Sequence, residues 1–146
     1  MTTQLFPYAN IIAGILVFIV GFCLHFIGQL ISLVNRDFAM KIGIWEKEML
    51  PEFEVYERGI AIADVLIGWV YGIAAVGLIL NAPWAYKLAW FPAVIFVYHG
   101  LSFWFWVRNQ NKAGYPTTSK GMRIGWSLTN LVTGILAILV AWFAPQ

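Results

Sequence analysis

The stretch that decides the fold is residues 11–34, "IIAGILVFIVGFCLHFIGQLISLV". It contains no Asp, Glu, Lys or Arg, and it is long enough for a helix to cross a bilayer, which takes about 20 apolar residues. A spanning segment must also satisfy its own backbone hydrogen bonds, as a helix does. Residues 11–34 therefore predict a transmembrane helix.

Three further apolar runs of similar length follow, and most charged residues lie between the runs. The chain is 61% hydrophobic and only 11% charged, whereas soluble domains have roughly 25% charged residues. We therefore expect one all-α domain over residues 1–146, a polytopic membrane protein built as an antiparallel bundle of four transmembrane helices. The predicted spans are 11–34, 60–80, 88–107 and 126–144.

The basic residues predict the orientation of this bundle. Of the nine Lys and Arg residues, eight lie in segments 35–59 and 108–125, and only Lys87 lies at the other end. Cytoplasmic loops carry an excess of Lys and Arg. We expect these two segments to be cytoplasmic loops, with both termini on the extracytoplasmic side, and the bacterial inner membrane to be the location. Topology accounts for the net charge of +2, so nucleic acid is not an expected partner.

Each predicted span carries one stripe of small and polar residues along a helix face. Such faces are expected to meet inside the bundle, while Leu, Ile, Val and Phe meet lipid. The four stripes are Gly14, Gly21, His25, Gly28 and Ser32; Ala61, Asp64, Gly68, Gly72 and Ala75; Ile95, His99, Ser102 and Trp106; and Ser127, Asn130, Thr133, Ala137 and Ala141.

Polar residues on the four spans also share a depth. At 1.5 Å of rise per residue, counting from the cytoplasmic ends puts one polar side chain of each span in a shallow layer, and three more lie about one turn deeper. The shallow layer is Gln29, Asp64, Ser102 and Asn130, and the deeper layer is His25, His99 and Thr133. We predict that these seven residues bind a ligand.

The first cytoplasmic loop contains six of the seven acidic residues. Pro51 followed by Glu52 is typical of a helix start, and this helix is expected to continue into the second span. It places Glu54, Glu57 and Arg58 at the predicted pocket entrance, with Glu54 and Arg58 spaced to pair. The seventh acid, Asp64, lies inside the span, where an acid must be paired or face water. It is either functional or part of a network that locks the helices.

Three functions are compatible with this layout. The first is a pocket near the cytoplasmic side for a small lipophilic ligand with a polar head, such as a quinone or a lipid. The second is a haem-binding or pigment-binding subunit, in which His25 and His99 hold the metal. The third is a non-catalytic accessory subunit of a larger membrane complex, or a homo-oligomer.

Sequence motifs add little to this choice. The chain has no HExxH, CxxC or GxSxG motif and no phosphate-binding glycine loop. No metal site other than the haem alternative is predicted, and no catalytic residue is assigned. The pattern leaves open whether the protein is an enzyme.

The layout resembles the small four-helix membrane proteins of the DoxX-like kind. The shared features are four short spans, a long first cytoplasmic loop, and the turn Glu57-Arg58-Gly59 entering a span that holds Asp64. The resemblance implies a membrane role linked to quinone or thiol oxidation, or to lipid. It implies no particular catalytic residue.

Overall fold

The fold consists of helices and connecting loops. The computed structural model describes residues 5–47, 49–115 and 119–144, and these residues contain no β-strand. The elements are α1 (Ala9–Leu16), η1 (Val17–Ile27), α2 (Gly28–Val34), α3 (Arg36–Lys41), α4 (Pro51–Ile67), α5 (Trp69–Ile79), α6 (Pro83–Leu88), α7 (Trp90–Lys112) and α8 (Lys120–Trp142). The all-α prediction is confirmed.

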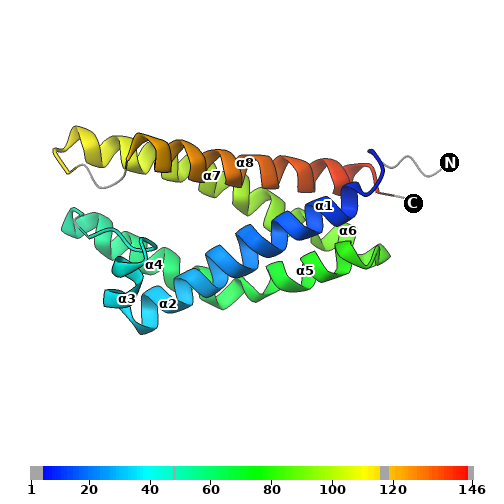
Figure 1. Cartoon of the computed structure of the whole chain (residues 1–146), viewed down its shortest axis with the longest axis horizontal. Helices are drawn as coiled ribbons and strands as arrows, with labels where there is room; N and C mark the ends of the chain where they lie inside the picture. The colour runs from blue at the N-terminus through cyan, green and yellow to red at the C-terminus, as the bar shows by residue number, and fades with distance from the viewer. Residues whose placement is uncertain (1–4, 48, 116–118, 145–146) are drawn as a thin grey trace.

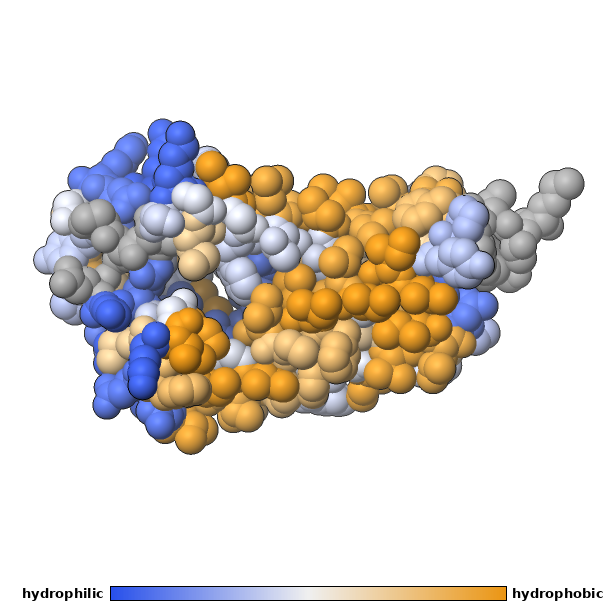
Figure 2. Space-filling model, in the orientation of Figure 1, coloured by the Kyte–Doolittle hydropathy of each residue, from blue (hydrophilic) through white to orange (hydrophobic). Residues whose placement is uncertain are grey.

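Three helical segments of the described chain are long and apolar enough to cross a membrane. They are Ala9–Val34, Pro83–Lys112 and Lys120–Trp142. Helices α4 and α5 meet the same test only as a pair, bent by 46°. The start of α1 and the end of α8 lie at one end of the molecule, and α3 lies at the other (Figure 1). The middle of the surface in view is mostly apolar, as expected of a membrane protein (Figure 2).

The bend between α4 and α5 differs from the single helix expected over residues 60–80. Helix α4 begins at Pro51, as predicted, but ends at Ile67, and Gly68 separates it from α5. Glycine is a poor helix former, and a Cβ added to Gly68 would lie 2.9 Å from the Cβ of Phe26. Gly72 similarly receives the ring of Phe22. This small-residue pair therefore serves a contact within the chain.

The segment η1 is a π-helix, in which backbone hydrogen bonds run from residue i+5 to residue i. At its end the N–H of Gly28 donates to the carbonyl oxygen of Cys23. Such helices are rare and are often found at functional sites. His25 lies in the last turns of η1 and is buried, so the unusual winding sets the direction of this side chain.

Helices α7 and α8 pack closely through two glycines. A Cβ on Gly134 would lie 2.7 Å from the carbonyl oxygen of Ala93, and one on Gly100 would lie 3.0 Å from that of Ser127. Only residues without a side chain allow this approach. The packed face of α7 therefore includes Ala93, Phe96 and Gly100, which are all buried.

The predicted stripes fare differently. The stripes of the first and fourth spans are buried throughout, and that of the second is buried except for the half-buried Gly72. The third stripe is only half-buried. This stripe still faces the interior as predicted, because His99 contacts Asp64 and Ser102 lines an internal cavity, while a neighbouring face of α7 that includes Gly100 packs against α8.

Candidate functional site

Two histidines converge on one carboxylate in the interior. His25 comes from η1, Asp64 from α4 and His99 from α7. Nδ1 of His25 lies 3.6 Å from Oδ2 of Asp64, and Nε2 of His99 lies 3.4 Å from Oδ1. The two imidazole centroids are 4.6 Å apart. Three elements that are distant in the sequence thus build one His-Asp-His cluster.

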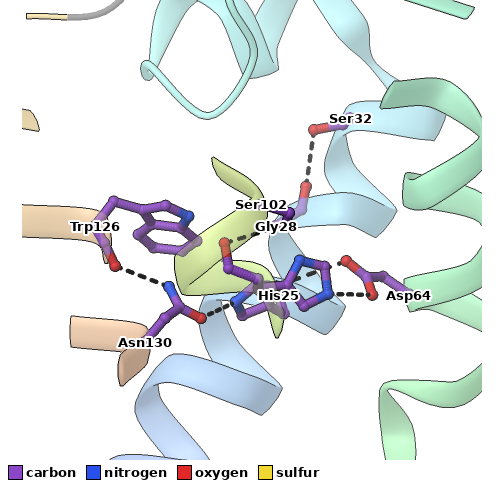
Figure 3. Close-up of polar contacts among 8 residues, drawn as sticks. His25, Gly28, Ser32, Asp64, Ser102, Trp126 and Asn130 are labelled. Carbon is purple, nitrogen blue, oxygen red and sulfur yellow. Dashed lines mark hydrogen bonds and ion pairs between the residues drawn. The ribbon is translucent and has the colours of Figure 1, made fainter. Parts of the chain in front are cut away.

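Asn130 of α8 holds His25 from the other side, as Figure 3 shows. Nε2 of His25 lies 2.8 Å from Oδ1 of Asn130, and the Asn130 amide donates from Nδ2 to the carbonyl oxygen of Trp126 at 3.0 Å. The second bond fixes which way the amide points, because its nitrogen must face the Trp126 carbonyl. Nε2 of His25 is therefore the donor to Asn130.

The cluster is almost fully enclosed. Asp64 and His25 are each 3% exposed, and Asn130 is 0% exposed. Oδ2 of Asp64 has no hydrogen-bond partner among the described residues. A buried carboxylate oxygen without a hydrogen bond costs folding free energy, so this atom needs a further partner.

A cavity of about 500 Å³ opens beside the cluster. It lies between α4 and α7, and the rings of His25 and His99 form part of its wall. Figure 2 shows a hollow at this hydrophilic end of the molecule. The remaining lining residues are Gln29, Glu52, Phe53, Tyr56, Glu57, Ile60, Ser102, Phe103, Phe105, Trp106, Asn109 and Trp126. Its size is typical of small-molecule sites, as is a mostly apolar wall with a few polar groups.

The predicted site residues divide into three groups. His25, Gln29, His99 and Ser102 line the cavity, while Asp64 and Asn130 lie behind the histidines in contact with them. Thr133 is buried on α8, and its hydroxyl donates to the carbonyl oxygen of Thr129. It takes no part in the cluster.

Of the three predicted entrance residues, only Glu57 lines the large cavity. Glu54 and Arg58 line a separate cavity of about 170 Å³ on another side of α4. Glu54 pairs with Arg36 at 2.5 Å, not with Arg58 as expected. The expected entrance set is therefore divided between two sides of α4, because α3 lies beside Glu54.

The aromatic wall of the cavity includes a residue of α8 that the sequence did not assign to the pocket. Trp126 lines the cavity with its ring centroid 5.2 Å from that of His25. Phe103 and Trp106 stack on each other at 5.8 Å and line the same cavity. Trp106 belongs to the predicted stripe of the third span, and Phe103 follows Ser102, so the stripe gave a partial signal for this wall.

The arrangement does not fit a haem held between His25 and His99. Two axial imidazoles must stand on opposite faces of a flat macrocycle, whereas these rings are 4.6 Å apart and both nitrogens face Asp64. The three residues do present ligand atoms that all lie within 4.8 Å of one another. Their geometry suits a single small ion and not a haem.

Comparison with models of protein families, with curated proteins and with solved structures finds no match to this chain.

Proposed function

We propose that this chain is a four-span membrane protein that binds a small lipophilic molecule, of the quinone or lipid type, in the cavity between α4 and α7. The observation that carries the proposal is the cavity itself, with an aromatic wall and two histidines at one side. Such a site accepts an apolar body and orients a polar head.

The proposed topology counts α4 and α5 as one bent span. The start of α1 and the end of α8 share one end of the molecule (Figure 1). The basic segments lie towards the other end, so the positive-inside rule assigns that end to the cytoplasm. The cavity, which involves the first turns of α4 and the later turns of α7, opens near the cytoplasmic side.

The rim of the cavity supports entry from the lipid. Tyr56 and Phe105 both line the cavity and are about half exposed, at 51% and 52%. Tyr56 contacts Tyr98 across the gap, with the two hydroxyl oxygens 3.4 Å apart. A ligand dissolved in the bilayer can therefore reach the cavity between α4 and α7 past Tyr56 and Phe105.

The charges of the wall narrow the ligand class. Glu52 and Glu57 line the cavity, and no Lys or Arg does so among the residues that the structure describes. An anionic head would be repelled, whereas a neutral carbonyl can accept a hydrogen bond from an imidazole N–H. A quinone head meets this requirement. The DoxX-like resemblance points to the same class.

The test is binding of a quinone with a short alkyl tail to the full chain in detergent, measured by equilibrium dialysis. We expect saturable binding of one quinone per chain, and at least a tenfold loss of affinity in Ser102→Leu, because the larger side chain fills the cavity. Arg58→Ala is the matched control, since Arg58 lies outside this cavity, and it should bind as the wild type does.

Absence of saturable binding, or equal binding by Ser102→Leu, would refute the proposal. Native mass spectrometry after gentle solubilisation tests the accessory-subunit alternative. Reproducible recovery of a larger partner protein, together with no quinone binding, would favour that alternative.

A further inference from the structure

The His-Asp-His cluster brings three possible metal ligands close together. Charge-assisted N–H···O hydrogen bonds are about 2.7–2.9 Å long, but the two His–Asp contacts measure 3.6 and 3.4 Å. Two metal–ligand bonds of about 2.1 Å that meet at a tetrahedral angle place their donor atoms about 3.4 Å apart. Both His–Asp separations are close to the second value, although each histidine faces a different oxygen of Asp64, and the ligand atoms of the three residues lie within 4.8 Å of one another.

The position of the proton on neutral His25 also supports a cation between His25 and Asp64. Because Nε2 donates to Asn130, neutral His25 presents a lone pair at Nδ1. That lone pair faces Oδ2 of Asp64, which has no hydrogen-bond partner among the described residues. Two acceptors facing each other in a buried site require a positive charge between them.

We propose that His25, Asp64 and His99 bind one divalent transition-metal ion, with Zn²⁺ as the representative. Imidazole nitrogen and carboxylate oxygen are its usual ligands in proteins. Metal-bound histidines almost always donate their second N–H to a fixed acceptor, which sets the tautomer. Asn130 is that acceptor for His25, and the Trp126 carbonyl fixes Asn130 in turn.

The proposed site keeps one coordination position open. Three protein ligands leave a position for water or substrate in the catalytic zinc sites of proteins. Here both histidines also line the cavity, so a molecule in the cavity can reach the ion. The metal site does not depend on the lipophilic-ligand proposal, because it rests on the cluster and not on what fills the cavity.

The test uses Co²⁺, whose visible absorption reports tetrahedral coordination. The full chain is purified without a histidine tag, stripped with a chelator and titrated with Co²⁺ in detergent. We expect one Co²⁺ per chain, with visible bands that disappear when Zn²⁺ is added. Asp64→Asn and His25→Ala should abolish these bands, and Asn130→Ala should weaken Co²⁺ binding by about 10- to 100-fold.

Thr133→Val is the matched control, because Thr133 is a buried polar residue of α8 outside the cluster. It should bind Co²⁺ as the wild type does. Circular dichroism checks that each variant keeps its helix content, and Asp64→Asn preserves the shape of the side chain if the alanine variant fails to fold.

Two results would overturn the proposal. One is the lack of stoichiometric Co²⁺ binding, which would mean that a proton on His25 supplies the positive charge. The other is equal Co²⁺ binding by Asp64→Asn and the wild type, which would place the ion elsewhere. Neither result alters the quinone test with Ser102→Leu, so failures of the two proposals are distinguishable.

Discussion

The two ends of this helical bundle are built on opposite principles. At the end that holds the start of α1 and the end of α8 (Figure 1), short side chains bring the helices together. We call this the terminal core; its buried members are Ala9, Ala13, Leu78, Ala85, Tyr86, Ala89, Val140 and Ala141. At the other end, α4 and α7 face each other across a cavity of about 500 Å³ lined by large aromatic residues.

The two halves differ in how closely their helices pack and in where their buried polar groups lie. In the terminal half, Asn10 donates from its side chain to the carbonyl oxygen of Leu78 at 2.9 Å, and Gly14 lets α1 approach α5. In the other half, the polar groups converge on Asp64 beside open volume. Close packing at one end therefore supports a buried cluster that borders a cavity at the other.

The largest loss of stability is expected when a side chain is enlarged in the closely packed half. Gly14→Val should lower the free energy of unfolding in detergent by about 3 kcal/mol, the upper part of the usual overpacking range. A Cβ at Gly14 would lie 2.8 Å from the carbonyl oxygen of Ala75, which cannot move aside as a side chain can. Thermal unfolding measures the loss.

The control for this variant is Gly59→Ala. A Cβ at Gly59 has nothing within 4 Å among the described residues, and alanine is the better helix former. It should be neutral or stabilising. If Gly14→Val unfolds at the wild-type temperature, the packed half is not packed as described.

A second variant tests the hydrogen bonds made by the side chain of Asn130. Asn130→Leu should cost about 2 kcal/mol, because it leaves the buried N–H of His25 without its partner. Chemical denaturation measures this change. The matched control is Thr133→Val, whose hydroxyl bonds only within its own helix. A smaller loss in Asn130→Leu than in the control would mean that the Asn130 bonds add no stability.

A third variant tests the buried hydroxyl group of Tyr71. The Tyr71 hydroxyl is buried and has no hydrogen-bond partner among the described residues, and an unsatisfied buried group costs about 1 kcal/mol or more. Tyr71→Phe should therefore raise the free energy of unfolding by about 1 kcal/mol. A marked destabilisation would show that the hydroxyl has a partner in solution.

The smallest effect on stability is expected in the cavity. Ser102→Leu adds volume where the structure has space, so it should change the free energy of unfolding by less than about 1 kcal/mol. The same variant should lose quinone binding under the proposed function. A loss as large as that of Gly14→Val would mean that the cavity end is as closely packed as the other end.

The sequence predicts the helices well because apolar length and charge are local properties. The runs at 11–34, 88–107 and 126–144 all appear as helices, and the start at Pro51 is correct. The stripes with His25 and Asn130 are buried as predicted, since glycine and small polar residues mark the faces that approach other helices. This was enough to bring His25, Asp64, His99 and Asn130 together.

What the sequence could not supply depends on contacts between helices. The bend at Gly68 follows from the ring of Phe26 seated against it, and the face of α7 that packs follows from Gly100 and Gly134. The contact of Trp126 with His25 depends on how α8 packs against η1. None of these pairings is visible in one helix considered alone.

The bend at Gly68 also has a mechanical consequence. Helix α4 has 17 residues and is therefore a lever about 25 Å long. A rotation of about 5° at Gly68 displaces the Pro51 end by about 2 Å, but it displaces Asp64, four residues from the pivot, by only about 0.5 Å. A change in the width of the cavity mouth by such a rotation would therefore move Asp64 about four times less than it moves the Pro51 end.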